Sequence, residues 1–241
     1  MVGPRPPTTD GPPSDRYRSG VADADDSPQP AGGHYFSTQP AVASRPREVT
    51  LALPDTHLTL ATDRGVFSGE RVDPGTKLLL LEGRSPEPEA RVLADIGCGY
   101  GPIAVTVALR APHATVWAVD VNARARELCR VNAERAGVAE RVRVVAPEEV
   151  PVDLRLDGIW SNPPIRIGTP ALHDLLIGWL DRLHPGATAT LVVQKNLGAD
   201  SLARWLAERG FTVQRAATGA GYRLLDVRSN GPRPHDDEAH A

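Results

Sequence analysis

The chain has 241 residues and a formal net charge of −3 at pH 7, with 41% hydrophobic and 24% charged residues. This balance is typical of a globular protein with a sizeable core. No stretch approaches the roughly 20 apolar residues of a membrane-spanning helix, and no apolar segment follows a basic start, so neither a membrane protein nor a secreted one is expected. The two cysteines, Cys98 and Cys129, are too few for a disulfide framework or a metal-ligand cluster. We therefore expect a cytoplasmic protein without a bound metal.

Composition separates the two ends of the chain from its centre. Residues 1–33 contain seven prolines and five glycines but almost no large apolar side chain, and residues 229–241 are polar and acidic. Such segments bury too little apolar surface to offset the entropy lost on ordering. We expect a disordered Pro/Gly-rich tail over 1–33, one folded domain over 34–228 and a disordered acidic tail over 229–241.

Within 34–228 the hydrophobic pattern alternates between the period of two that marks strands and the period near 3.6 that marks helices. A hairpin over 49–53 and 58–62 is expected first, followed by a short helix from Pro74 to Leu81. The remaining elements are expected to be helices over 102–110, 123–136, 170–183 and 199–209, and strands over 91–96, 115–120, 141–145, 157–161, 187–193, 211–217 and 222–227. Strands separated by helices predict a doubly wound, mostly parallel α/β sheet.

The loop after the first strand of this series carries a glycine pattern. The chain there reads DIGCGYG, from Asp95 to Gly101. Glycines at alternate positions allow a sharp turn and let a ligand lie against the backbone, without Cβ atoms in the way. The spacing differs from the Gly-x-Gly-x-x-Gly of dinucleotide sites. The acid before the glycines would repel a phosphate but would suit a cationic or amine-bearing ligand.

Two later strand ends carry polar groups of complementary chemistry. Asp120 can accept hydrogen bonds from both hydroxyls of a ribose, or it can cap the helix that begins near Asn122. Further along, Asn162-Pro163-Pro164 follows the strand over 157–161. Consecutive prolines fix φ and remove donors, which leaves bare carbonyls at the crevice. The Asn162 side-chain oxygen and the free Pro163 carbonyl would then form a pair of acceptors for a planar NH2 group.

At these loops the sequence resembles the class I S-adenosylmethionine-dependent methyltransferases, in particular the methyltransferase small-domain family that includes 16S rRNA guanine-N2 methyltransferases. The resemblance covers about 34–228 and implies a Rossmann-like, seven-stranded sheet with an antiparallel last strand. It is carried by Asp95 to Gly101, Val119 to Asn122 and Asn162 to Arg166, with support from His34 to Ser37, Asp63 with Gly65 to Ser68, Val72-Asp73 with Gly75-Thr76, Val193-Gln194 and Gly221 to Arg223. Two departures are the missing degenerate N-terminal copy of two-domain members and Ala146-Pro147-Glu148, where many relatives have an acid that contacts adenine.

The resemblance implies S-adenosylmethionine as the cofactor and assigns roles to the matching residues. Cofactor binding is expected from Asp95, Gly97, Cys98, Gly99, Gly101, Asp120, Val121 and Asn162. Catalysis is expected from Asn162, Pro163 and Pro164, which would hold an exocyclic amine in line with the methyl–sulfur bond. Substrate binding is expected from Ile165, Arg166, Phe67 and Gln194.

Several of these side chains also have ordinary structural interpretations. Ile165 replaces the aromatic residue that stacks on the flipped base in amino-methylating relatives, so it would pack an apolar face on a purine. Arg166 would pair with an RNA phosphate or be a solvated surface residue. Phe67 would cover the ligands or belong to the core. Tyr222 is expected to pack in the last hairpin and not at the site.

The expected function is methylation of an exocyclic amine, guanine N2 of ribosomal RNA, with ribosomal RNA or the ribosomal subunit as the partner. One alternative is a protein glutamine methyltransferase, whose relatives share Asn-Pro-Pro but usually continue with Tyr. The other is a non-catalytic module that binds the cofactor or RNA. The two intact loops argue against a non-catalytic module, because a degenerate copy usually loses one of them.

Overall fold

A seven-stranded sheet organises the part of the chain that the computed structural model describes, residues 1–3 and 42–231. In spatial order its strands are β5 (Val142–Val145), β4 (Thr115–Val119), β3 (Val92–Ile96), β6 (Leu156–Ser161), β7 (Leu183–Gln194), β9 (Tyr222–Arg228) and β8 (Thr212–Gly219). Neighbours from β5 to β7 are parallel, whereas β9 runs antiparallel to both β7 and β8. The expected mostly parallel sheet with an antiparallel last strand is confirmed.

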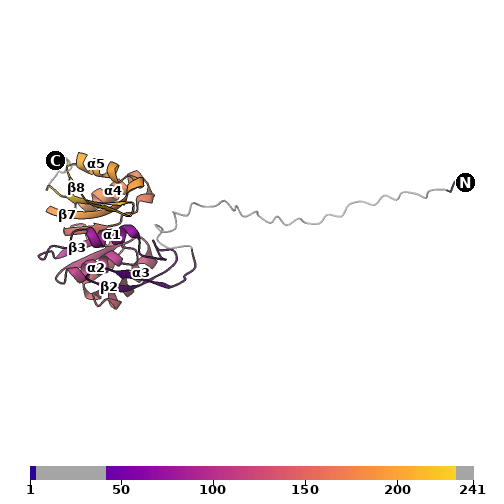
Figure 1. The fold of residues 1–241 in the computed structure, drawn as a ribbon, viewed down its shortest axis with the longest axis horizontal. Helices are drawn as coiled ribbons and strands as arrows, with labels where there is room; N and C mark the ends of the chain where they lie inside the picture. The colour runs from indigo at the N-terminus through magenta and orange to yellow at the C-terminus, as the bar shows by residue number, and fades with distance from the viewer. Residues whose placement is uncertain (4–41, 232–241) are drawn as a thin grey trace. The chain divides into compact units, whose positions relative to one another are not determined.

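Helices cover both faces of the sheet (Figure 1). One layer contains α1 (Pro74–Glu82), α2 (Pro102–Arg110), α3 (Ala123–Arg135) and the hairpin of β1 (Arg47–Ala52) and β2 (His57–Thr62); the other contains α4 (Thr169–Leu180) and α5 (Ala199–Glu208). Alternation along the strands explains the two layers, since successive side chains point to opposite faces. Leu93 and Leu224 pack toward the α1–α3 layer, and their neighbours Ala94 and Leu225 pack toward α4 and α5.

The largest difference from the expected elements lies between α4 and β7. The helix was expected to continue to residue 183, but it ends at Leu180, and the strand begins at Leu183. Leu183 pairs with Leu156 of β6 and is buried in the core. Sheet pairing and burial therefore override the helical pattern at these residues.

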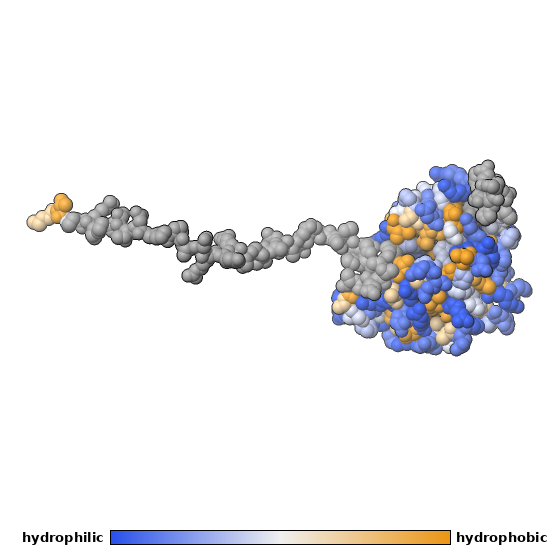
Figure 2. Space-filling model, turned by 180° about the vertical axis from the view of Figure 1, so that it is seen from behind, coloured by the Kyte–Doolittle hydropathy of each residue, from blue (hydrophilic) through white to orange (hydrophobic). Residues whose placement is uncertain are grey.

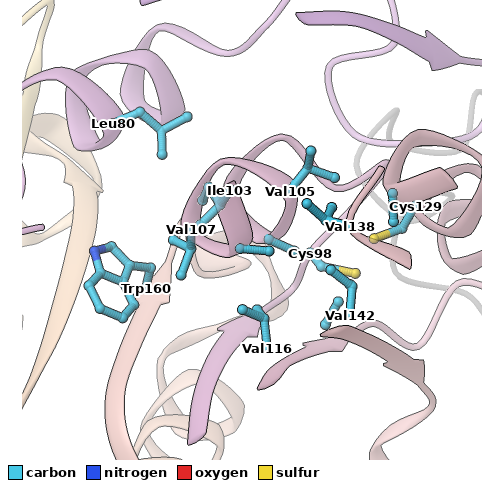
Figure 3. Packing of buried hydrophobic residues seen from close by; sticks show 14 of the residues in the cluster. Leu80, Cys98, Ile103, Val105, Val107, Val116, Cys129, Val138, Val142 and Trp160 are labelled. Carbon is cyan, nitrogen blue, oxygen red and sulfur yellow. The ribbon is translucent and has the colours of Figure 1, made fainter. Parts of the chain in front are cut away.

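The core of the α1–α3 layer holds both cysteines. Figure 3 shows the sulfur atoms of Cys98 and Cys129 turned toward one another, beside Val138 and Val142. Both thiols are free and buried. The pKa of the Cys98 thiol is raised, first by its hydrogen bond with Cys129 and then by burial. This side chain is therefore an inert packing group.

The expected tails lie largely outside the described residues. This holds for residues 4–33 and 232–241, and also for the segment His34 to Ser37. At the carboxyl end, Ser229 is buried and its backbone bonds with Gly186 and Ala187 continue the pairing of β7 with β9. The folded domain thus extends past its expected end at residue 228.

No helix within the described ranges is long and apolar enough to cross a membrane. Polar and apolar residues intermingle on the face of the domain drawn in Figure 2, as on protein surfaces in general.

Candidate active site

A cavity of about 370 Å³ lies where the carboxyl ends of β3, β4 and β6 bring the three candidate loops together. This is the edge at which doubly wound sheets bind their ligands. Most of the residues expected at the site line this cavity: Phe67, Gly97, Gly99, Asp120, Val121, Asn162, Pro163, Pro164, Ile165, Arg166 and Gln194. Asp95, Cys98 and Gly101 are not among its lining residues.

Gly99 and Gly101 have different surroundings in the glycine loop. All three glycines of the loop have positive φ, 74° at Gly97, 56° at Gly99 and 90° at Gly101. A Cβ on Gly99 would meet nothing within 4 Å, so the backbone there faces open space at the cavity. A Cβ on Gly101 would lie 2.6 Å from the Sγ of Cys129. Gly99 therefore leaves room for a ligand, and Gly101 lets the loop pack on α3.

Asp95 lies beneath the glycine loop and caps a helix. It is buried, and its Oδ2 accepts a hydrogen bond of 2.9 Å from the backbone N–H of Ala104 in α2. Its other oxygen has no partner among the described residues. Burial raises the pKa of Asp95 to about 8, with a smaller contribution from the nearby Asp120. The raised pKa favours the protonated form of Asp95, which weakens the negative charge expected at this position.

Asp120 does line the cavity, and it also holds the loops together. Its Oδ2 accepts from the N–H of Gly99 and its Oδ1 from the N–H of Asn122, both at 2.8 Å. Burial raises the pKa of Asp120, although both backbone hydrogen bonds oppose this effect. Each carboxylate oxygen keeps a further lone pair for a ligand hydroxyl. Asp120 therefore makes local backbone contacts, and these leave the expected ligand contact possible.

Asn122 ties the Phe67 loop to this edge of the sheet. Its side-chain oxygen caps α3 by accepting from Arg124 and Ala125, and its Nδ2 donates to the carbonyl of Gly65 at 2.8 Å. Phe67, two residues further on, is 44% exposed and lines the cavity. This exposure removes the alternative that Phe67 belongs to the core.

The Asn162-Pro163-Pro164 loop differs in one respect from the expected arrangement. The Pro163 carbonyl is not bare, because it accepts a 2.8 Å hydrogen bond from the N–H of Ile165. The tight turn that Pro164 imposes brings these two groups together. A carbonyl oxygen has a second lone pair, so Pro163 can still accept one more hydrogen bond.

Three residues with no expected catalytic or binding role are linked to Asn162, two directly and the third through Asp73. The Nδ2 of Asn162 donates to Asp73 Oδ1 at 2.8 Å and to Thr76 Oγ1 at 3.0 Å, and the Tyr222 hydroxyl donates to Asp73 Oδ2 at 3.2 Å. Asp73 and Tyr222 both line the cavity, so Tyr222 belongs to the site and not only to the hairpin. Burial raises the pKa of Tyr222, and the Asp73 carboxylate adds to this effect.

The remaining walls come from other elements. Arg166 is exposed at the cavity and Ile165 is half-buried. Gln194 pairs with Tyr222 across β7 and β9, which places both side chains at the same end of the cavity. Leu175 and Trp179 of α4 contribute apolar surface.

No acidic side chain of the loop after β5 lines the cavity. Pro147 lines the cavity, whereas Ala146 is buried and its N–H donates to Glu149 Oε2 at 2.6 Å. At this point of the cavity, where many relatives have an acid, the structure therefore has Pro147. No group of three or more His, Cys, Asp or Glu side chains that could hold a metal ion occurs within residues 42–231.

The strand order, the glycine turn under the cavity and the acid at the end of β4 define a class I S-adenosylmethionine-dependent methyltransferase. Comparison with known proteins gives the family. A model of the methyltransferase small domain matches residues 57–226, and the chain belongs to this family. The family expected from the sequence is confirmed, and S-adenosylmethionine is the cofactor of this methyltransferase.

Individual relatives cover the chain to different extents. The chain is 33% identical over 198 residues to the uncharacterized protein YbxB of Bacillus subtilis. The aligned region covers 81% of this chain and 98% of that protein. It is 30% identical over 185 residues to ribosomal RNA small subunit methyltransferase C of Shewanella amazonensis, covering 72% of this chain and 53% of that enzyme. The chain thus spans about half the length of that enzyme.

A solved structure shares the fold. The 16S rRNA N2 G1207 methyltransferase of T. Thermophilus, solved with AdoMet and guanosine, superposes with a TM-score of 0.65 at 24% sequence identity. The match covers 79% of this chain and 52% of the other.

Proposed function

We propose that this protein methylates an exocyclic amine of RNA, and that its substrate is guanine N2 in the RNA of the small ribosomal subunit. One observation carries the proposal. The glycine loop with Asp120 and the Asn162-Pro163 acceptors line a single cavity, so a bound methyl donor and a target amine would meet there. The named activities of the small-subunit methyltransferase C relative and of the AdoMet- and guanosine-bound neighbour support the choice of substrate.

The residues present fit the cofactor. The open space beside Gly99 accommodates a ligand against the backbone, and the oxygens of Asp120 keep lone pairs for the ribose hydroxyls. Val121 and Pro147 would flank the adenine with apolar surface. When bound, S-adenosylmethionine supplies an activated methyl group on a positively charged sulfur.

Because the donor is already activated, the protein has mainly to position the acceptor. The side-chain oxygen of Asn162 and the second lone pair of the Pro163 carbonyl would accept the two hydrogens of an NH2 group. These contacts orient the nitrogen lone pair toward the methyl group and hold it at reacting distance. Both acceptors are uncharged and only orient the amine. The methylated nitrogen would carry a positive charge and would be strongly acidic, so it can release one hydrogen as a proton to water, and no side chain in this scheme needs to act as a strong base.

The outer part of the cavity suits a flipped base. Phe67 and Ile165 offer apolar surface for the faces of a purine, and Gln194 offers an amide for its polar edge. The exposed guanidinium of Arg166 is placed to pair with a phosphate of the same RNA strand.

Protein glutamine methylation is the second candidate, because a glutamine side chain also presents a planar NH2 group. Ile165 argues against it, since protein-modifying relatives with Asn-Pro-Pro continue with Tyr. A non-catalytic module is disfavoured because both loops line the cavity with their polar groups available.

The proposal is tested by mapping modified nucleosides in ribosomal RNA from cells that lack the protein. Loss of one N2-methylguanosine from small-subunit RNA, restored by the wild-type gene but not by its Asn162→Ala variant, is the expected result. Unchanged ribosomal RNA, together with loss of a methylated glutamine from a ribosomal or release protein, would favour the second candidate.

A further inference from the structure

The amide of Asn162 is held in one orientation. Both hydrogens of its Nδ2 are used, one by Asp73 Oδ1 and one by Thr76 Oγ1. Its side-chain oxygen accepts no hydrogen bond from any residue between 42 and 231. Asn162 lines the cavity, so this oxygen is the polar atom of the side chain that is left for a ligand.

Asp73 determines this orientation. The oxygen and nitrogen of an Asn side chain are nearly the same size, so a neighbouring group must decide which of them faces which way. A carboxylate has acceptors only, and an amide oxygen turned toward it would be repelled. Thr76 alone could not decide, because a hydroxyl both donates and accepts.

Asp73 is itself fixed from several sides. It is 8% exposed, and it caps α1 by accepting from the N–H of Thr76 at 3.0 Å. The Tyr222 hydroxyl donates to its other oxygen. Gly75 has no room for a side chain, because a Cβ there would lie 2.6 Å from the Tyr222 ring and 2.9 Å from Asp73 Oδ1. The carboxylate therefore cannot turn away from Asn162 without disturbing α1 or β9.

We propose that Asp73 is a positioning residue for methyl transfer. It keeps the side-chain oxygen of Asn162 directed at the methyl acceptor, and the side-chain NH2 of Asn162 directed away from it. The consequence is a requirement on the substrate. The methyl acceptor must donate a hydrogen bond to Asn162, as an amine does. An acceptor that presents only lone pairs would face the side-chain oxygen of Asn162 and be repelled by it. This deepens the proposed function, on which it rests for the reaction itself.

The decisive variant is Asp73→Ser. Serine is a good helix N-cap, so α1 keeps its cap, but its side chain is too short to reach Asn162 as well. The probe is small-subunit RNA transcribed in vitro, with radiolabelled S-adenosylmethionine under single-turnover conditions. We expect a rate constant lower by roughly 10- to 100-fold, the range for losing an outer partner that orients a site residue, and cofactor affinity within about twofold of wild type.

A double-mutant cycle separates positioning from other roles. If Asp73 acts through Asn162, then Asp73→Ser should cost no further rate, within about threefold, in a chain that already carries Asn162→Ala. Additive losses would overturn the proposal and would assign Asp73 an independent role, such as proton acceptor. Asp226→Ser is the matched control, since Asp226 bonds Thr190 from the same strand as Tyr222 but does not line the cavity; it should leave the rate unchanged.

A second readout needs no substrate. In a nitrogen-15 NMR spectrum of the full chain, the side-chain NH2 pair that disappears in Asn162→Ala belongs to Asn162. Its hydrogens should exchange slowly with water in the wild type and at least 10-fold faster in Asp73→Ser. Unchanged exchange would overturn the positioning role. If RNA is not methylated at all, the proposed substrate is wrong, and the exchange rates alone decide the role of Asp73.

Discussion

Asn162 concentrates the chemistry of the proposed reaction in one side chain. Replacing it by Ala removes the acceptor for the target amine and leaves the glycine loop and Asp120 untouched. We expect the single-turnover rate of RNA methylation to fall by roughly two to four orders of magnitude, with little change in cofactor affinity measured by calorimetry. Asn230→Ala, which removes a surface amide that bonds Gly210, is the control. A wild-type rate in Asn162→Ala would reduce the loop to an ordinary turn.

The raised pKa of Asp95 leads to a prediction of how the stability of the protein depends on pH. Its pKa is raised to about 8 in the folded protein by burial, against about 3.9 for an unfolded aspartate. Between these values the folded state holds one more proton than the unfolded state. The free energy of unfolding should therefore fall as pH rises from about 4 to 8, by up to about 1.4 kcal/mol per pH unit.

The measurement compares wild type with Asp95→Asn, whose side chain is neutral at every pH and can still accept from Ala104. Urea unfolding at pH 6 and pH 8 should show a larger loss of stability in the wild type than in the variant, by about 2 kcal/mol. Equal losses would mean that Asp95 is ionised in the folded protein, and that the buried carboxylate is a charged part of the site.

At the scale of the elements, Gly99 of the glycine loop and Gly137 after α3 offer a matched pair of substitutions. Gly99 and Gly137 both have positive φ, and a Cβ at either position would meet nothing within 4 Å. Ala should therefore strain the backbone similarly at both sites, by about 1 kcal/mol. Only Gly99 lines the cavity. We expect Gly99→Ala to weaken S-adenosylmethionine binding at least 10-fold by calorimetry, and Gly137→Ala to leave it unchanged.

Most elements could be predicted from local patterns, and the exceptions have physical reasons. α2 has the expected bounds, because Pro102 and Pro112 delimit a run of apolar residues. The pattern failed between α4 and β7, where pairing of Leu183 with Leu156 decides the conformation. It also could not place Tyr222 at the site, because strand order is set by pairing between distant segments. β9 inserts between β7 and β8 and so brings Tyr222 beside Gln194.

For the molecule as a whole, cofactor binding should stabilise the entire domain, because the cavity joins loops from β3, β4 and β6. At 100 times the dissociation constant, S-adenosylmethionine should add about 2.7 kcal/mol to the free energy of unfolding. This corresponds to a rise in Tm of about 5 to 10 °C for a domain of this size. NAD should give no shift, since the loop lacks the dinucleotide spacing. A comparable shift with NAD would contradict the assignment of the cofactor.

The sequence by itself determined the fold class, the family and the three loops of the site, because periodicity, caps and glycine spacing are local properties of the chain. Only the tertiary structure decided which residues of those loops line the cavity. It buried Cys98 and placed Asp95 under the loop with a raised pKa. It also brought Asp73 to Asn162 across 89 residues of chain. Such contacts depend on how whole elements pack, and a local pattern cannot specify them.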